Sequence, residues 1–191
     1  MLDNGSFVVW FPKKLRYSKY GNEKMIFLIG VNHEVQYIKK GIDNTKFKLF
    51  LKTKIEETKA DLIAEEMSGY ALKKFGMTNS VPRAVAEELG IKHLYCDPDK
   101  NQRKELGILE EKDIIAKISG GKVLHPKDQE RFIKIRNIMW NKREVFWYQK
   151  LMKFRFKKCI FVFGSDHVDN FLNLLDRHNL KPHLLIRKFS V

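Results

Sequence analysis

The chain has 191 residues, a formal net charge of +14 and a hydrophobic content of 43%. These values fit one domain with a substantial core and exclude a disordered chain. No apolar run approaches the roughly 20 residues of a membrane span, and the N-terminus lacks the basic start and long apolar segment of a signal peptide. Cys96 and Cys159 have no second cysteine at zinc-ligand spacing. We therefore expect a reduced cytoplasmic protein of one domain (1–191), without a membrane partner.

Positive charge is concentrated in one segment. Residues 122–158 hold twelve Lys or Arg against three Asp or Glu, which places +9 of the net +14 in 37 residues. A surface of this kind attracts polyanions such as nucleic acid, anionic lipid or an acidic substrate. A solvated basic helix without a partner explains the same composition, so both interpretations are open.

Apolar runs and helical spacing alternate along the chain. After an N-terminal edge extension at 1–24, the predicted elements in chain order are a strand at 25–29, a helix at 46–59, a strand at 61–64, a helix from the Ser80 cap to Gly90, a strand at 91–96, a helix at 108–119, a long helix at 125–156, a strand at 159–163, a helix at 168–178 and a strand at 183–189. This alternation predicts an α/β fold, a mostly parallel central sheet with helices on both faces. The apolar stripe of the long helix, from Phe132 to Leu151, predicts packing against that sheet.

Two copies of Gly-x-x-His each end a strand-forming run. Met25 to Ile29 leads into Gly30-Val31-Asn32-His33, and Cys159 to Phe163 leads into Gly164-Ser165-Asp166-His167. Glycine lets the chain turn sharply after a strand or approach another group closely. Sites of open α/β sheets lie beyond the carboxyl ends of the strands. A single copy is explained by a structural turn with a solvated histidine, but two copies favour a shared site.

Acidic residues end two further predicted strands. Glu65 and Glu66 follow the run at 61–64, and alternation sends their side chains to opposite faces, so only one of the two can enter the site. Asp97 follows the run at 91–96. A solvated acidic pair and an ordinary Asp-Pro turn are the alternatives.

The long helix carries arginine and tryptophan on one face. Arg136, Trp140, Arg143 and Trp147 recur at three- and four-residue spacing. An arginine there can hold a carboxylate or an anionic substrate group through two hydrogen bonds. Stacking of guanidinium on indole, which would only fix the helix in place, is the alternative interpretation.

Together these motifs resemble a superfamily that contains the TraB/PrgY pheromone-shutdown proteins, the Tiki proteases, the erythromycin esterases and the haem-binding ChaN lipoproteins. That pattern is two Gly-x-x-His motifs, a glutamate at the end of an intervening strand, and Arg-Asn or Arg-Asp on a helix before the second motif. The matching residues are Gly30 to His33, Glu66, Arg136-Asn137 and Gly164 to His167, within a core of residues 25–178. The chain lacks the large helical insertions that shape the pockets of these relatives, so the resemblance implies the site and no particular activity.

The resemblance and the residue types give a hydrolase as the leading hypothesis, acting on a small molecule or peptide. In a metal-dependent version, His33, Glu66 and His167 would bind Mn, Co, Zn or Fe, with Asp97 or Asp166 as fourth ligand or base.

In a metal-free version, His33 would activate water while Glu66 orients it. In either version Arg136 would orient Glu66 or an anionic group of the substrate.

Two hypotheses from other classes remain. One is a nucleic-acid or polyanion binder that uses the basic helix at 127–158; the other is haem or small-ligand binding without catalysis.

Overall fold

The computed structural model describes residues 24–38 and 43–190, so the predicted extension at 1–24 lies outside the described residues except for Lys24. The strands are β1 (Met25–Val31), β2 (Leu62–Glu65), β3 (Lys92–Tyr95), β4 (Lys158–Gly164) and β5 (His183–Phe189). The α-helices are α1 (Thr45–Thr58), α2 (Gly69–Lys74), α3 (Val81–Leu89), α4 (Lys100–Glu105), α5 (Glu111–Ser119), α6 (Gln129–Lys153) and α7 (Val168–Arg177). Short 3-10 helices are η1 (His33–Gln36), η2 (Pro126–Asp128) and η3 (Ser165–His167).

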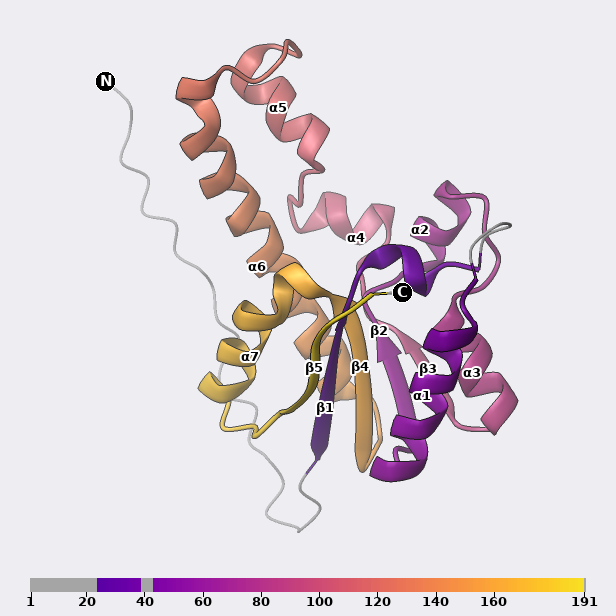
Figure 1. Cartoon of the computed structure of the whole chain (residues 1–191). Coiled ribbons are helices and arrows are strands. Elements are labelled where there is room, and N and C mark those ends of the chain that lie inside the picture. The colour runs from indigo at the N-terminus through magenta and orange to yellow at the C-terminus, as the bar shows by residue number, and fades with distance from the viewer. Residues whose placement is uncertain (1–23, 39–42, 191) are drawn as a thin grey trace.

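The strands form one parallel sheet in the order β3-β2-β4-β1-β5. The prediction of an α/β fold is confirmed. Register brings Val31 beside Gly164 at the ends of β1 and β4, and Glu65 beside Val162 on β2 and β4. Three neighbouring strands therefore deliver both Gly-x-x-His motifs and the acidic pair to one edge of the sheet (Figure 1).

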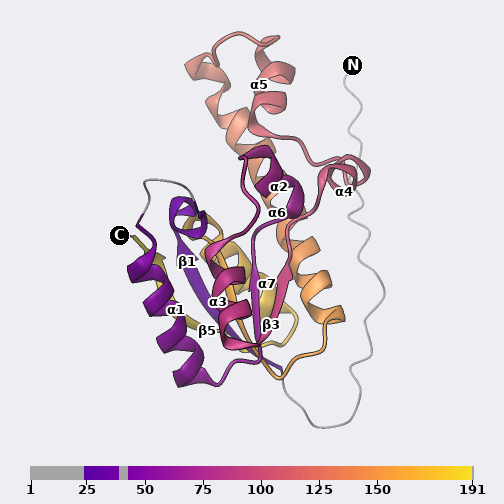
Figure 2. The ribbon, with the colours of Figure 1, turned by 90° about the vertical axis from the view of Figure 1, so that its right-hand side faces the viewer.

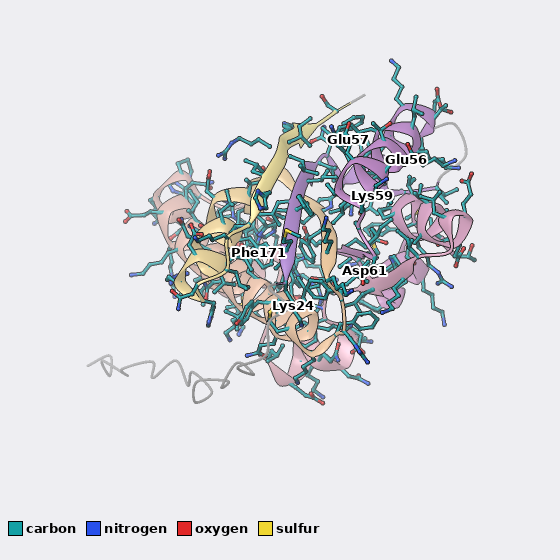
Figure 3. The ribbon with its side chains drawn as sticks, turned by 90° about the horizontal axis from the view of Figure 1, so that it is seen from below. Lys24, Glu56, Glu57, Lys59, Asp61 and Phe171 are labelled. Atoms are coloured by element: carbon teal, nitrogen blue, oxygen red, sulfur yellow. The ribbon has the colours of Figure 1, made fainter. Side chains whose placement is uncertain are left out.

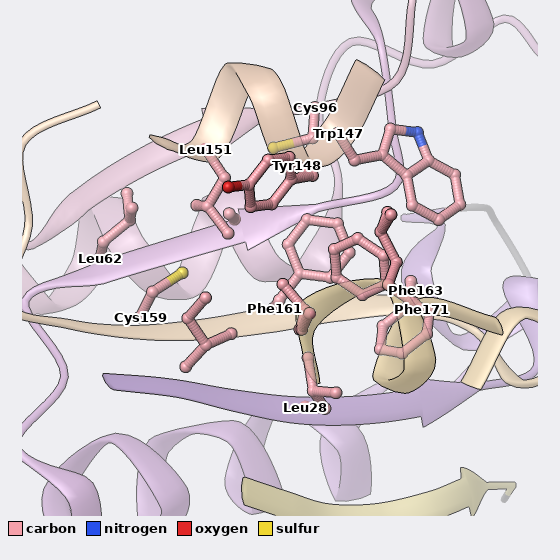
Figure 4. Close-up of a cluster of buried hydrophobic side chains, with 14 of the residues drawn as sticks. Leu28, Leu62, Cys96, Trp147, Tyr148, Leu151, Cys159, Phe161, Phe163 and Phe171 are labelled. Carbon is pink, nitrogen blue, oxygen red and sulfur yellow. The ribbon is translucent and has the colours of Figure 1, made fainter. Parts of the chain in front are cut away.

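Helices cover both faces of this sheet, as the alternation of strand and helix predicts (Figure 2). On one face, Phe47 and Leu51 of α1 and Val85 of α3 pack with Ile63 and Val162 of the sheet. The core of the other face is built from α6 and α7, with these residues in one buried cluster (Figure 4): Trp147, Leu151, Phe161, Phe163 and Phe171. Side chains that alternate along the central strands β1, β2 and β4 thus enter two separate cores.

The first half of α6 extends beyond the sheet. A seven-residue strand such as β4 spans about 23 Å, whereas the 25 residues of α6 span about 38 Å. Phe132 and Met139 accordingly pack with Ile108 and Ile114 rather than on the sheet, in a third cluster formed with α5. The predicted sheet packing of the whole stripe is therefore wrong for its first half, because the helix is longer than the sheet it covers.

The opposite, amino-terminal edge of the sheet is closed by internal hydrogen bonds. Lys24 donates to the carbonyls of Met152 and Phe154, at 2.9 Å each, and so satisfies the end of α6. Asp61 accepts from the backbone of Lys157 and Lys158. Figure 3 views the molecule from this side, with Lys24 and Asp61 labelled. Among the helices that the structure describes, none is both long and apolar enough to cross a bilayer.

Candidate active site

The two Gly-x-x-His motifs converge on one carboxylate. Glu66, directly after β2, is buried, and its Oε1 lies 3.8 Å from Nε2 of His33 and 3.7 Å from Nε2 of His167. The same oxygen accepts from Arg143 at 2.5 Å, while Oε2 accepts from the backbone N–H of Gly164 at 2.7 Å. The histidine distances are too long for hydrogen bonds, so Glu66 acts on both imidazoles through its charge.

The surroundings keep Glu66 ionised. Burial alone would raise its pKa, but Arg143, the two histidines and the Gly164 N–H together lower the pKa from 4.5 to about 2. Each of these groups favours the charged form by opposite charge or by hydrogen bonding. At neutral pH the cleft therefore contains a fixed negative charge at Glu66.

Glu65 faces the other side of the sheet, as strand alternation requires. This fully buried carboxylate accepts from Nε2 of His93 at 2.8 Å and from the hydroxyl of Ser80, which also caps α3. Its second oxygen accepts from the side-chain amide of Gln36 at 3.4 Å. Of the two glutamates, Glu66 is thus the one beside the histidines, and Glu65 supports the site from behind.

His33 is held by an amide and exposed to solvent. Its Nδ1 lies 2.9 Å from the Oε1 of Gln36, on the same short helix η1. Because the amide nitrogen of Gln36 faces the carboxylate of Glu65, its oxygen faces the histidine and accepts the Nδ1 proton. The Nε2 atom then carries a lone pair. The side chain of His33 is 45% exposed, so part of the ring is open to water.

His167 is held by a carboxylate and buried. Its Nδ1 lies 2.7 Å from the Oε1 of Glu144 on α6, and its side chain is only 4% exposed. The rings of Trp140 and Trp147 pack against it at centroid distances of 4.7 and 5.0 Å. The carboxylate fixes the Nδ1–H tautomer, as it does for histidines held by a carboxylate in other sites.

Gly164 forms the floor between the two motifs. A Cβ atom added there would lie 2.6 Å from Nε2 of His33 and 3.2 Å from Oε2 of Glu66. The glycine of the second motif is therefore needed so that the histidine of the first can approach the carboxylate. Its φ of −59° is one that any residue adopts, so space rather than backbone conformation requires glycine.

The remaining predicted acidic residues lie in different surroundings. Asp97 is buried and accepts from Arg143 at 2.9 Å and from the indole of Trp147 at 3.0 Å, and it pairs with Arg103. It therefore stands behind Arg143 rather than in the cleft, where a fourth ligand or a base would have to lie. Asp166 is exposed and lines the cleft.

Arg143, not Arg136, contacts Glu66. Burial opposes its charge, but Asp97 and Glu66 raise the pKa of Arg143 above its ordinary value. Arg136 lies two turns earlier on α6, with its guanidinium 4.4 Å from the ring centre of Trp140. Both predicted uses of an arginine on this face are thus seen, ion pairing at one position and stacking at the other. Of the two predicted partners of Arg136, Glu66 is thus paired with Arg143 instead, and the anionic group of a substrate stays a prediction.

A cleft of about 330 Å³ opens in front of these side chains. Its lining combines the site residues His33, Arg143 and His167 with residues of α5, of the first half of α6 and of the segment just before α5. These residues form an apolar wall that consists of Leu109, Ile114, Met139 and Trp140. This volume suits a small ligand, since small-molecule sites begin near 300 Å³.

The predicted metal ligands are arranged around an ion pair. The oxygen of Glu66 that faces both histidines already pairs with Arg143, so an ion bound there would lie beside a guanidinium. Over residues 24–38 and 43–190, no group of three or more His, Cys, Asp or Glu is placed to hold a metal. Metal dependence and haem binding stay predictions.

Sequence reasoning missed Glu144 and Gln36, which hold the two histidines. Glu144 is completely buried on α6, four residues after Trp140 and three before Trp147, hence on the predicted arginine–tryptophan face. An acidic residue on the buried face of a helix was a usable signal, because it needs a partner. Gln36 gave no such signal, since glutamine in a loop is common.

No family model, curated protein or solved structure matches the chain. The family resemblance therefore stays a prediction that rests on the motifs.

Proposed function

We propose that the protein is a hydrolase in which His33 activates a water molecule without a metal. The observation that carries the proposal is the placement of Glu66 beside the Nε2 atoms of both Gly-x-x-His histidines. A carboxylate so placed stabilises the imidazolium that forms when a histidine takes up a proton.

The proton transfers follow from the two tautomers. A water molecule in the cleft gives a proton to Nε2 of His33, and its oxygen bonds to the scissile carbon. The imidazolium, stabilised by Glu66, then returns the proton to the leaving group as the scissile bond breaks. His167 presents a second Nε2 to the same carboxylate. It is buried, so its role is to fix the geometry opposite His33 rather than to meet bulk water.

A panel of chromogenic esters, amides and peptides tests this proposal with the tag-free protein. We expect hydrolysis of at least one class, and a loss of at least about 100-fold in His33→Ala, the size of a general-base contribution. His125→Ala is the matched control, since His125 is exposed at the start of the long helix. Activity that survives in His33→Ala would overturn the proposal.

Metal dependence is separated in the same experiment. Elemental mass spectrometry on the tag-free parent, His33→Ala and His167→Ala measures bound Mn, Co, Zn and Fe. The metal-free mechanism predicts that activity persists after dialysis against a chelator. Stoichiometric metal in the parent that is lost in both variants, together with loss of activity on chelation, would replace it with the metal-dependent version.

A second candidate function, polyanion binding, rests on the charges of the long helix. Among the described residues, no carboxylate pairs with Arg131, Lys134 or Lys153 of α6 or with the nearby Arg155, and all four are exposed. Such cations release counterions from nucleic acid on binding. We expect the affinity for duplex DNA or RNA to fall steeply with salt, and to fall when Lys150, Lys153, Lys157 and Lys158 are neutralised. Binding that is indifferent to salt would remove this candidate.

A further inference from the structure

Arg136 differs from the other arginines of the cleft because no carboxylate among the described residues pairs with it. Arg103 pairs with Asp97, and Arg143 pairs with both Asp97 and Glu66. Within the part of the chain that the structure describes, Arg136 makes no ion pair, and its buried Nε atom has no hydrogen-bond partner. A buried donor on a charged group is costly to leave unsatisfied, so an acceptor from outside the chain would complete it.

Arg136 lies close to the two histidines, so an acceptor bound to it would lie beside the candidate active site. Its guanidinium lies 4.4 Å from the centre of the Trp140 ring, and the same ring lies 4.7 Å from the ring of His167. One indole therefore separates the unpaired cation from the histidine pair. A ligand held at Arg136 would extend over Trp140 toward His33 and Glu66, with Met139 of the apolar wall beside it.

The other charges of the cleft limit the class of ligand. Glu110 lines it too but pairs with Lys74. Glu111 and Asp166 also line it and are exposed, so solvent screens them more than it screens the buried side of Arg136. These carboxylates oppose a polyanion that runs through the cleft, but they leave room for one anionic group at Arg136. Nucleic acid, if bound, would therefore use the outer surface of the long helix and not this cleft.

We propose that Arg136 and Trp140 form a subsite for the single carboxylate or phosphate group of a small molecule with an apolar body. Arg136 binds two oxygens of the anion with its planar fork of N–H groups, and Trp140 supports the apolar part. That this molecule is the substrate rests on the proposed hydrolase function; the anion binding itself does not.

Calorimetric titration at physiological salt tests the subsite with hexanoate and, separately, inorganic phosphate as probes. We expect saturable binding of at least one probe, weakened tenfold or more in Arg136→Gln. Arg136→Lys, which keeps the charge but not the fork, should weaken binding less. Arg131→Gln is the matched control, because Arg131 is an exposed arginine of the same helix outside the cleft lining. Thermal melting of each variant verifies folding.

The outcomes separate this proposal from the hydrolase proposal. Tighter binding of hexanoate identifies a carboxylate ligand with an apolar body, and tighter binding of phosphate identifies a phosphate ligand. Equal weakening in Arg131→Gln and Arg136→Gln, or no saturable binding of either probe, would overturn the subsite. Neither probe has a bond to hydrolyse, so a failed activity screen leaves a positive titration standing, and a failed titration leaves the hydrolase proposal standing.

Discussion

His33 and His167 come from the same motif on neighbouring strands and face the same carboxylate, yet their surroundings differ. His33 is 45% exposed and is oriented by the neutral amide of Gln36, whereas His167 is 4% exposed and is oriented by the carboxylate of Glu144. Burial, rather than the motif, therefore distinguishes the two histidines. In the proposed mechanism the exposed copy exchanges protons with water and substrate, and the buried copy is a fixed part of the wall.

Removal of the shared carboxylate should affect both copies and give the largest effect. In Glu66→Gln, the imidazolium of His33 loses its stabilising charge and Arg143 keeps only Asp97 as an anionic partner. We expect a loss of at least about 100-fold in kcat/KM and about 3 kcal/mol in the free energy of unfolding. Hydrolysis assays and urea unfolding measure the two effects. Glu88→Gln, at an exposed glutamate, is the control. An unchanged urea midpoint in Glu66→Gln would contradict the buried ion pair with Arg143.

Acid should also weaken the site through Glu66. Its pKa is about 2 in the folded protein against 4.5 ordinarily, so the unfolded chain binds the proton more readily. Stabilisation by the ionised carboxylate is complete above pH 4.5 and is lost as the pH falls through about 2, a loss of about 3 kcal/mol. Urea unfolding across this window, with Glu66→Gln for comparison, measures it. Equal pH dependence of parent and variant would show that another group is responsible.

A methyl group at Gly164 should displace the exposed histidine, His33. In Gly164→Ala the new Cβ would lie 2.6 Å from Nε2 of His33, so the ring must move. A displacement near 1 Å costs about 100-fold in rate. Oε2 of the buried Glu66, 3.2 Å from the new Cβ, also has to shift slightly, so thermal melting of the variant is recorded beside its activity. Gly69→Ala is the control, since a Cβ there meets nothing within 4 Å. Full activity in Gly164→Ala would argue against His33 as the base.

Replacement of Glu144, the partner of the buried histidine His167, should have a smaller effect on the rate. In Glu144→Gln an amide replaces the carboxylate that fixes the Nδ1–H tautomer of His167. We expect a loss of about tenfold in kcat, typical for groups that orient a functional histidine. Long-range ¹H–¹⁵N spectra should show the change at His167 and none at His33. Glu130→Gln, at an exposed position on the same helix, controls for the charge.

Much of the fold follows from local pattern, whereas the partners of the site do not. The sheet was predictable because β1, β2, β3 and β4 fall in short apolar runs that lead into Gly, Glu or Asp, and β5 follows Pro182. Helices α2 and α4, six residues each, were not predicted, because they are too short to show amphipathic spacing. The choice between Arg136 and Arg143 was also open in the sequence. It depends on where α6 crosses the sheet edge, which packing decides and helical spacing does not.

A double-mutant cycle on kcat/KM with His33→Ala, His167→Gln and the double variant measures whether the two histidines act together. If both histidines serve one reaction at Glu66, their effects are not additive, because residues that act as a unit are lost together. We expect the double variant to be about as slow as His33→Ala alone. Effects of the two substitutions that multiply, or a parent-like rate in His33→Ala, would contradict this expectation.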